Sequence, residues 1–322
     1  MNTQKINLYT LLILIFVVSC SPNRPPTDAE GRPLIVKSGT IDVDLVETTP
    51  IVFKNEVYRF EYVRAGYWAN ETGDSYFRFI NHKTGRATKS FAKGFHLGSA
   101  FVINDIVYVT AVDIWDGEEV HIFSSQDLEN WYSWLAFKLP GYGIFNTSLT
   151  LAENKYILMF EIGKPEEQAG ERFTANFATS TDLKKWDILS PEHNYAKDRY
   201  TAPHCLRYLD GYYYNFYLEA YNGYEMRVVR SRDLINWEPS PLNPVLKASK
   251  EDKQIANSRL SEELRQKIAN ATDINNSDID FCEFNGRLII NYSWGNQQGE
   301  EFLAEATYEG TSEDFLRGWF PR

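Results

Sequence analysis

Short apolar strands separated by tight turns dominate the chain after residue 46. Five times an apolar strand is followed by a turn with Asn, Asp or Gly and then by a strand dense in Tyr, Ile, Val and Phe. The turns lie at Asn55-Glu56, Asn104-Asp105, Glu153-Asn154, Asp210-Gly211 and Asn285-Gly286. This pattern is typical of β-hairpins. The sequence therefore predicts an all-β fold whose units begin near Thr48, His96, Phe145, Tyr200 and Asn275.

A second repeat follows these hairpins. The pattern SxDLxxW occurs at 125–131, 180–186 and 231–237, with its Asp residues 55 and then 51 positions apart, and a looser copy with one extra residue stands at 312–319. Ser and Asp are expected to cap a tight turn through side-chain to backbone hydrogen bonds, and Leu and Trp to pack between neighbouring sheets. We interpret the motif as structural.

Repeats of about fifty residues, each one antiparallel sheet, predict a β-propeller. Five hairpins give five four-stranded antiparallel blades. A short helical insertion is expected at 247–272, where Ser261 precedes Leu264, Ile268 and Ala271 at helical spacing. A β-sandwich or a six-bladed propeller fits the period and the number of turns less well.

The N-terminus has the pattern of a secreted lipoprotein. Lys5 precedes an apolar run from Leu8 to Val18, and Ser19-Cys20 follows at once. We predict a signal peptide over 1–20 with lipidation of Cys20, a tether over 21–45 and a propeller domain over 46–322. The protein would then be lipid-anchored in a bacterial membrane, at the cell surface or in the periplasm, and only the lipid would touch the bilayer. An ordinary secretory signal is the alternative.

Charge and cysteine content narrow the partners. The net charge is −11 with no basic stripe, which disfavours nucleic acid. Aromatic residues are 15% of the chain, which suits twisted strands and sugar-stacking surfaces. Cys205 and Cys282 stand outside any zinc-binding spacing, so free thiols are expected, with a disulfide as the alternative. We expect a monomer that binds carbohydrate.

Propeller geometry indicates where a site would lie, because the start of each first strand and the end of each second strand meet at one funnel. Acids at these positions are the predicted catalytic residues, since glycoside hydrolysis takes one carboxylic acid and one carboxylate: Glu161, Glu219, Asp278 and Asp280. The predicted sugar-binding residues are Glu47, His96, Ser99, Asn146, Arg199, Tyr200, Thr201, His204, Asn276 and Trp294. Arg64 and Asp113 end the other second strands.

With these motifs the chain resembles the five-bladed propeller glycoside hydrolases of the family 43, 32 and 117 group. The SxDLxxW turns and the pair Thr201-Ala-Pro203-His204 and Asp210-Gly211-Tyr-Tyr-Tyr carry the resemblance over nearly the whole mature chain. It implies a base in the first blade before a Pro, and an acid in a Glu-(Gly/Ala)-Pro segment of the fourth. Here those positions are Thr49-Pro50 and Thr201-Ala202-Pro203, and Thr serves neither role.

The resulting hypothesis is a glycoside hydrolase acting on a poly- or oligosaccharide with a relocated pair of carboxylates. A non-catalytic surface glycan-binding lipoprotein is the alternative. A phosphorylase would need a cationic pocket, for which only Arg199 and Arg230 are candidates. No cofactor is expected, and a structural Ca²⁺ near Asp278 and Asp280 stays open, because two acids are a weak metal signal.

Overall fold

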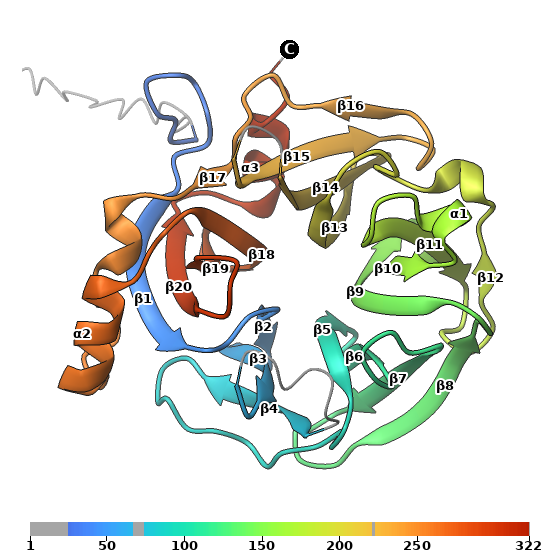
Figure 1. Ribbon diagram of the computed structural model, residues 1–322, viewed down its shortest axis with the longest axis horizontal. Coiled ribbons are helices and arrows are strands. Elements are labelled where there is room, and N and C mark those ends of the chain that lie inside the picture. Colours follow the sequence, from blue (N-terminus) through green and yellow to red (C-terminus); the bar gives the residue numbers. More distant parts are fainter. Residues whose placement is uncertain (1–24, 67–73, 221–222, 322) are drawn as a thin grey trace, which may run out of the picture.

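Twenty strands in the described part of the computed structural model form five antiparallel sheets in a ring around a central axis (Figure 1). The structure describes residues 25–66, 74–220 and 223–321. The predicted five-bladed β-propeller is confirmed. The predicted signal peptide over 1–20 and the predicted lipidation site Cys20 lie outside the described residues.

The blades follow one another along the chain. The first is built from β2 (Thr49–Phe53), β3 (Glu56–Arg64) and β4 (Ser75–Asn81). The second is built from β5 (His96–Ile103), β6 (Ile106–Val112), β7 (Glu119–Ser125) and β8 (Tyr132–Lys138), and the third from β9 (Gly143–Ala152), β10 (Lys155–Lys164), β11 (Thr174–Ser180) and β12 (Asp187–Ile188). The fourth is built from β13 (Thr201–Leu209), β14 (Tyr212–Glu219), β15 (Glu225–Ser231), β16 (Trp237–Pro239) and β17 (Leu246–Lys247). In the first blade, isolated bridges from Phe91 to Phe77 and from Ala87 to Ile80 take the place of a fourth strand.

Both ends of the described chain build the fifth blade. Its inner strands are β18 (Asn275–Phe284), β19 (Arg287–Gly295) and β20 (Glu301–Tyr308), and its outer strand is β1 (Val36–Val43), antiparallel to β20 (Figure 1). The predicted tether over 21–45 is therefore wrong for 36–43. Pairing between the two ends of the described chain completes the last blade and closes the ring.

The SxDLxxW segments form the predicted turns. In the second blade the Ser125 hydroxyl accepts the Leu128 amide at 2.8 Å, and Asp127 Oδ1 accepts the amides of Glu129 and Asn130. Leu128 has a φ of 64° and is buried. Trp131 then stacks on Phe91 of the first blade, with ring centroids 3.8 Å apart. The same capping hydrogen bonds recur around Asp182 and Asp233.

The fourth, looser copy departs from this pattern. Residues Ser312–Gly318 form helix α3, and Thr311 rather than Ser312 is its N-cap, in a capping box with Asp314. The extra residue before Trp319 gives Phe315 and Trp319 helical spacing, so both become buried on one face. Phe315 stacks on Phe216 of the fourth blade, so the helix covers the blade junction that a turn covers elsewhere.

The expected insertion after the fourth blade is present. It contains the 3₁₀ helix η3 (Lys250–Lys253) and α2 (Glu262–Asn270), which begins with the Ser261 hydroxyl accepting the Leu264 amide. Ile268 and Ala271 are buried, as their spacing predicts. Two further short helices, α1 (Glu166–Ala169) and η2 (Pro191–His193), lie in the third blade. Within the described residues no helix is long and apolar enough to span a membrane.

Candidate active site

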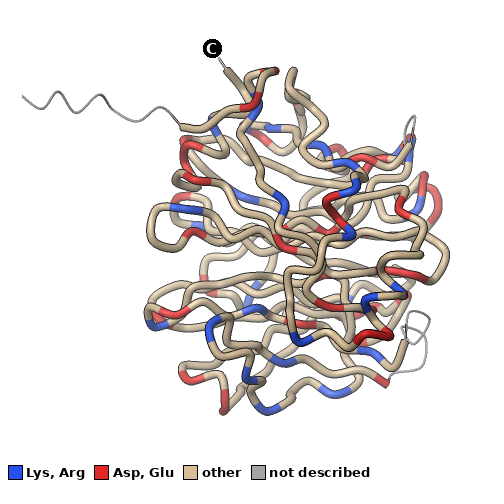
Figure 2. Tube along the Cα trace, turned by 90° about the vertical axis from the view of Figure 1, so that its left-hand side faces the viewer, with Lys and Arg blue, Asp and Glu red and all other residues tan. Residues whose placement is uncertain are grey.

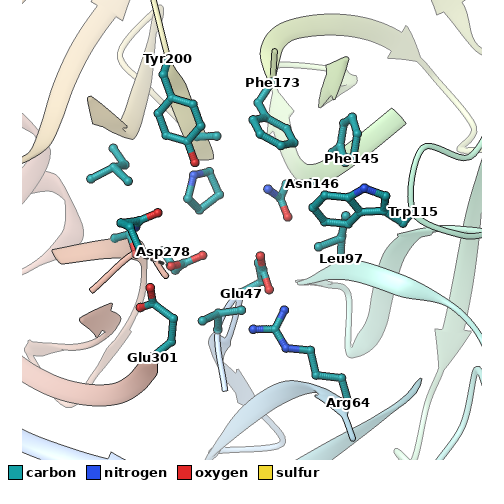
Figure 3. Close-up of a pocket in the computed structure, with 16 residues that line it drawn as sticks. Glu47, Arg64, Leu97, Trp115, Phe145, Asn146, Phe173, Tyr200, Asp278 and Glu301 are labelled. Atoms are coloured by element: carbon teal, nitrogen blue, oxygen red, sulfur yellow. Dashed lines mark hydrogen bonds between the residues drawn. The ribbon is translucent and has the colours of Figure 1, made fainter. Parts of the chain in front are cut away.

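A pocket opens at the centre of the ring, where the blades converge (Figure 3). Each of the five blades contributes to it. Its lining residues are Val46, Glu47, Arg64, Leu97, Trp115, Phe145, Asn146, Phe173, Tyr200, Ala202, Pro203, Leu218, Ser277, Asp278, Gln297 and Glu301. A smaller chamber adjoins it and shares Glu47, Asn146 and Asp278. This chamber has a polar wall, which includes Thr48, Ser99, Thr147, Ser148 and His204.

Three carboxyl groups and one guanidinium form one side of the pocket: Glu47 before β2, Asp278 on β18, Glu301 at the start of β20 and Arg64 at the end of β3 (Figure 3). Arg64 is the one basic residue among the described lining residues. Three acids around one cation cannot all ionise without strong repulsion, so part of the group stays protonated at neutral pH.

The pKa values follow this expectation. Burial raises the pKa of Glu47 well above its usual range, and the charge of Asp278 adds to the shift. Burial and, to a smaller extent, the charge of Asp278 raise the pKa of Glu301 to about 8. Burial also raises the pKa of Asp278, but the hydroxyls of Ser277 and Ser293 and the charge of Arg64 favour its ionised form. The arrangement thus places two acids with raised pKa values beside Asp278, whose ionised form the two serine hydroxyls and Arg64 favour.

The backbone around Asp278 aims its side chain at the pocket. β18 has a bulge between Ser277 and Asp280, and Asp278 has a φ of 55°. Asp adopts left-handed backbone more readily than most residues, so this position can take the conformation that the bulge requires. The Ser277 hydroxyl donates to Asp278 Oδ2 at 2.5 Å, and Ser293 bonds the same oxygen. The carboxylate is therefore fixed in place.

An aromatic wall faces the acids. Trp115, Phe145, Phe173 and Tyr200 lie on the opposite side of the pocket in Figure 3. Their rings pack edge to face, with centroids 4.9 Å apart for Trp115 and Phe145 and 5.7 Å for Phe173 and Tyr200. The guanidinium of Arg172 lies 4.9 Å from the Phe145 ring centre and stiffens the wall from outside. Apolar ring faces opposite hydrogen-bonding groups suit a sugar.

Two predicted catalytic residues do not line either cavity. Glu161 is fully buried behind Asn146 and His204, and it accepts hydrogen bonds from both. Glu219 accepts the Tyr217 hydroxyl at 2.9 Å, and the guanidinium groups of Arg199 and Arg227 lie 3.4 and 3.6 Å from its oxygens. At the end of β14 it is Leu218 that faces the pocket.

Asp280, the other predicted catalytic acid besides Asp278, lines only the smaller chamber. It is bonded to Arg207 and accepts the Phe281 amide at 2.7 Å. Asp278 and Asp280 thus have separate partners. Among the described residues no group of three or more His, Cys, Asp or Glu side chains is placed to hold a metal ion.

Several predicted sugar-binding residues are placed as expected. Glu47, Asn146 and Tyr200 line the main pocket, and Ser99 and His204 line the chamber. Burial lowers the pKa of His204 to about 3, so its ring is neutral. The 2.8 Å contact between His204 Nδ1 and Glu161 is therefore a hydrogen bond rather than an ion pair.

The other predicted sugar-binding residues are not in the pocket. Trp294 is fully buried, stacks on Phe302 and donates to Thr40 Oγ1, so the predicted stacking platform is wrong. Asn276 accepts a hydrogen bond from Lys37 of β1 and donates one to Asp252 of the insertion.

His96 is buried, its Nδ1 and the Tyr62 hydroxyl share a hydrogen bond of 2.7 Å, and burial lowers the pKa of the ring to about 4. Thr201 is fully buried. The guanidinium of Arg199 forms an ion pair with Glu219 and lies over the Tyr195 ring. None of these three lines the main pocket or the chamber.

Most of the lining residues were not predicted as site residues, among them Arg64, Trp115, Phe145, Phe173 and Glu301. Glu301 starts a third strand, which begins at the same funnel where the second strand ends, directly opposite Gly295. Glu300-Glu301 before the apolar run Phe302-Leu303-Ala304 was the available signal. Trp115 and Phe173 lie in loops, whose conformation the pattern does not define.

The fold is shared with known glycoside hydrolases. A thermostable family-43 glycoside hydrolase has a TM-score of 0.58 and 10% identity, with 84% of this chain and 92% of that one covered. A xylan β-1,4-xylosidase from Bacillus halodurans C-125 has a TM-score of 0.56 and 12% identity, covering 84% of this chain and 54% of that one. An α-L-arabinofuranosidase from Fusarium graminearum has a TM-score of 0.55 and 11% identity, covering 85% and 97%.

No protein-family model and no curated protein matches the sequence. The similarity therefore lies in the structure: this chain has the five-bladed β-propeller fold of the family-43 glycoside hydrolases and related enzymes. Identities of 10–12% establish the fold alone. Activity has to be argued from the pocket.

Proposed function

We propose that the protein is a glycoside hydrolase whose catalytic site is the central pocket. The observation that carries the proposal is a set of buried polar oxygens without hydrogen-bond partners that converge on one cavity. Glu47 Oε2, Asn146 Oδ1 and Glu301 Oε2 have no hydrogen-bond partner within the described residues, and all three groups line the pocket. Buried polar oxygens without hydrogen-bond partners are costly, so a ligand rich in hydroxyl groups, which both donate and accept hydrogen bonds, fits them.

The acids divide into two roles. Asp278, held by two serine hydroxyls and near Arg64, is the carboxylate that attacks the anomeric carbon or activates a water. Glu47, whose raised pKa keeps it protonated, is the acid that gives its proton to the leaving glycosidic oxygen. Glu301 is a third, protonated group that limits the negative charge beside Asp278.

The charge balance also favours a class of sugar. Three acids with one guanidinium repel carboxylated or sulfated sugars. A neutral sugar instead meets groups that can hydrogen-bond its hydroxyls on one side and the aromatic wall on the other. The arginines on which a phosphorylase would depend, Arg199 and Arg230, do not line the pocket. The proposal is therefore hydrolysis of a neutral glycan without phosphate.

Two solution measurements test the proposal together. The purified domain is incubated with neutral polysaccharides, including arabinan and xylan, and with polygalacturonate, with and without phosphate, while new reducing ends are measured. Calorimetry records binding of the same glycans. We expect new reducing ends from a neutral glycan at a rate independent of phosphate. Binding heat without product would identify a glycan-binding protein instead, and phosphate-dependent cleavage a phosphorylase.

The location is part of the proposal. A lipid on Cys20 would tether the propeller outside the cytoplasm, where polysaccharides are met. Labelling cells with a fatty-acid analogue tests this, with Cys20→Ser as the matched variant. We expect label on the wild type and none on C20S; equal labelling of both would refute lipidation at this position.

A further inference from the structure

We infer that Glu161 and His204 are positioning residues that orient the amide of Asn146, so that its oxygen accepts a hydrogen bond from a hydroxyl of the bound sugar. The inference rests on the proposed function and assigns one specific contact within it. Asn146 touches the substrate in this account, and Glu161 and His204 act through Asn146.

Glu161 is built into the wall behind the pocket. Its side chain and that of His204 are both fully buried. Glu161 Oε1 accepts the backbone amide of His204 at 3.0 Å and lies 2.8 Å from His204 Nδ1. The other oxygen, Oε2, accepts Asn146 Nδ2 at 2.9 Å. A backbone amide always donates, so it fixes which part of the Glu161 carboxyl remains for Asn146.

This hydrogen bond determines the orientation of Asn146. An Asn amide has one donating and one accepting end, and the donating end is committed to Glu161. The accepting end, Oδ1, is left for the pocket and has no partner among the described residues. In Figure 3 the Asn146 amide and the Glu47 carboxyl are directed toward each other across the pocket. The Asn146 oxygen is thus presented beside the proposed catalytic acid.

The chemistry of the contact follows from this orientation. An oriented acceptor recognises a donor, and the donor that a neutral sugar offers is a hydroxyl. A sugar that lacks this hydroxyl would leave Oδ1 buried and unpaired, which is the situation in which polar sites discriminate most strongly. Asn146 is therefore a specificity-determining residue for one hydroxyl position.

A single substitution should reverse the amide. In Glu161→Gln the side-chain oxygen has to accept the His204 backbone amide, so the new NH₂ group faces Asn146. Two donors would then meet, and Asn146 relieves this by turning its oxygen to Gln and its NH₂ to the pocket. Adding Asn146→Asp restores an acceptor, because one Asp oxygen takes the Gln donor and the other faces the pocket.

The experiment measures kcat and KM for the cleaved neutral glycoside and for its monodeoxy analogues. The variants are Asn146→Ala, Glu161→Gln, the double variant Glu161→Gln/Asn146→Asp and Glu263→Gln, an exposed control on α2. We expect N146A and E161Q to lower kcat/KM by about 10- to 100-fold. The double variant should recover at least about tenfold over E161Q, and the control should match the wild type.

The deoxy series identifies the contact. For one deoxy analogue, the kcat/KM of the wild type should fall by the same factor by which N146A lowers kcat/KM for the full glycoside. The kcat/KM of N146A should be the same for this analogue as for the full glycoside. Thermal unfolding is followed in parallel, and N146A, at a partly exposed position, keeps the test valid where E161Q folds poorly.

Three outcomes overturn different claims. An active wild type with unchanged kcat/KM in N146A, or no recovery in a folded double variant, would overturn this inference alone. A wild type that binds the sugar without cleaving it would overturn hydrolysis, and the same variants are then compared by calorimetry. A wild type with neither turnover nor binding would overturn both.

Discussion

The ammonium of Lys37 and the carboxylate of Asp252 lie 2.8 Å apart, and both side chains are shielded from solvent. Lys37 is on β1, the strand that closes the ring, and Asp252 is on η3 of the insertion. The hydroxyl of Tyr292 and the amide of Asn276 bond the same carboxylate, which ties both segments to the fifth blade. The insertion thus fastens the closing strand.

Lys37→Met tests this fastening. The substitution leaves the Asp252 charge buried without its cation, which costs about 3–5 kcal/mol in comparable buried pairs. We expect urea unfolding to show a loss of that size. Lys89→Met, which removes an exposed partner of Glu129, is the control and should change stability little. Equal behaviour of the two variants would mean that Lys37 does not hold β1.

A pair of tryptophans separates core from pocket. Trp294→Ala removes a fully buried ring and its hydrogen bond to Thr40, so a loss of about 3–5 kcal/mol in stability is expected. Trp115→Ala removes part of the aromatic wall and is expected to weaken sugar binding about tenfold. Calorimetry and thermal unfolding of both variants check the contrast. The assignment would be reversed if folded W294A bound sugar more weakly than the wild type while W115A bound it equally well.

The pKa of Glu301, raised to about 8, predicts a pH dependence of stability. Between its ordinary value of 4.5 and 8, the unfolded chain has released this proton and the folded chain retains it, so stability falls as pH rises. In this range the free energy of unfolding falls by roughly 1.4 kcal/mol per pH unit for one proton. Above pH 8 both states have released the proton, so this group causes no further change in stability.

Glu301→Gln should remove this slope. Urea unfolding at several pH values between 5 and 8 would show the variant gaining stability relative to the wild type as pH rises. The exposed Glu263→Gln should keep the wild-type slope. An unchanged slope in E301Q would show that Glu301 ionises normally in the folded protein.

Much of the fold could be predicted because its determinants are local. Ser125, Asp127 and their counterparts cap turns within three residues, and Asn104 and Asp105 both take positive φ in a two-residue hairpin turn. β1 could not be found in this way. Its partner β20 lies at the other end of the chain, and its pattern in Val36–Val43 is too weak to stand out alone.

The site was only partly predictable because the strands are irregular at the funnel. First strands of the second, fourth and fifth blades have register shifts at His96–Ser99, Thr201–His204 and Ser277–Asp280. A bulge changes which face a side chain takes, so simple alternation fails there. This is why Asp278 reaches the pocket, while Thr201 and Asn276 do not.

The most direct test of the central claim is the turnover of Glu47→Gln and Asp278→Asn on the glycan that the wild type cleaves, measured beside Glu263→Gln. Both variants are expected to lose at least about 10³-fold in kcat while remaining folded, because each removes one half of the proposed acid and carboxylate pair. Full turnover in either folded variant would contradict the assignment of catalysis to the central pocket.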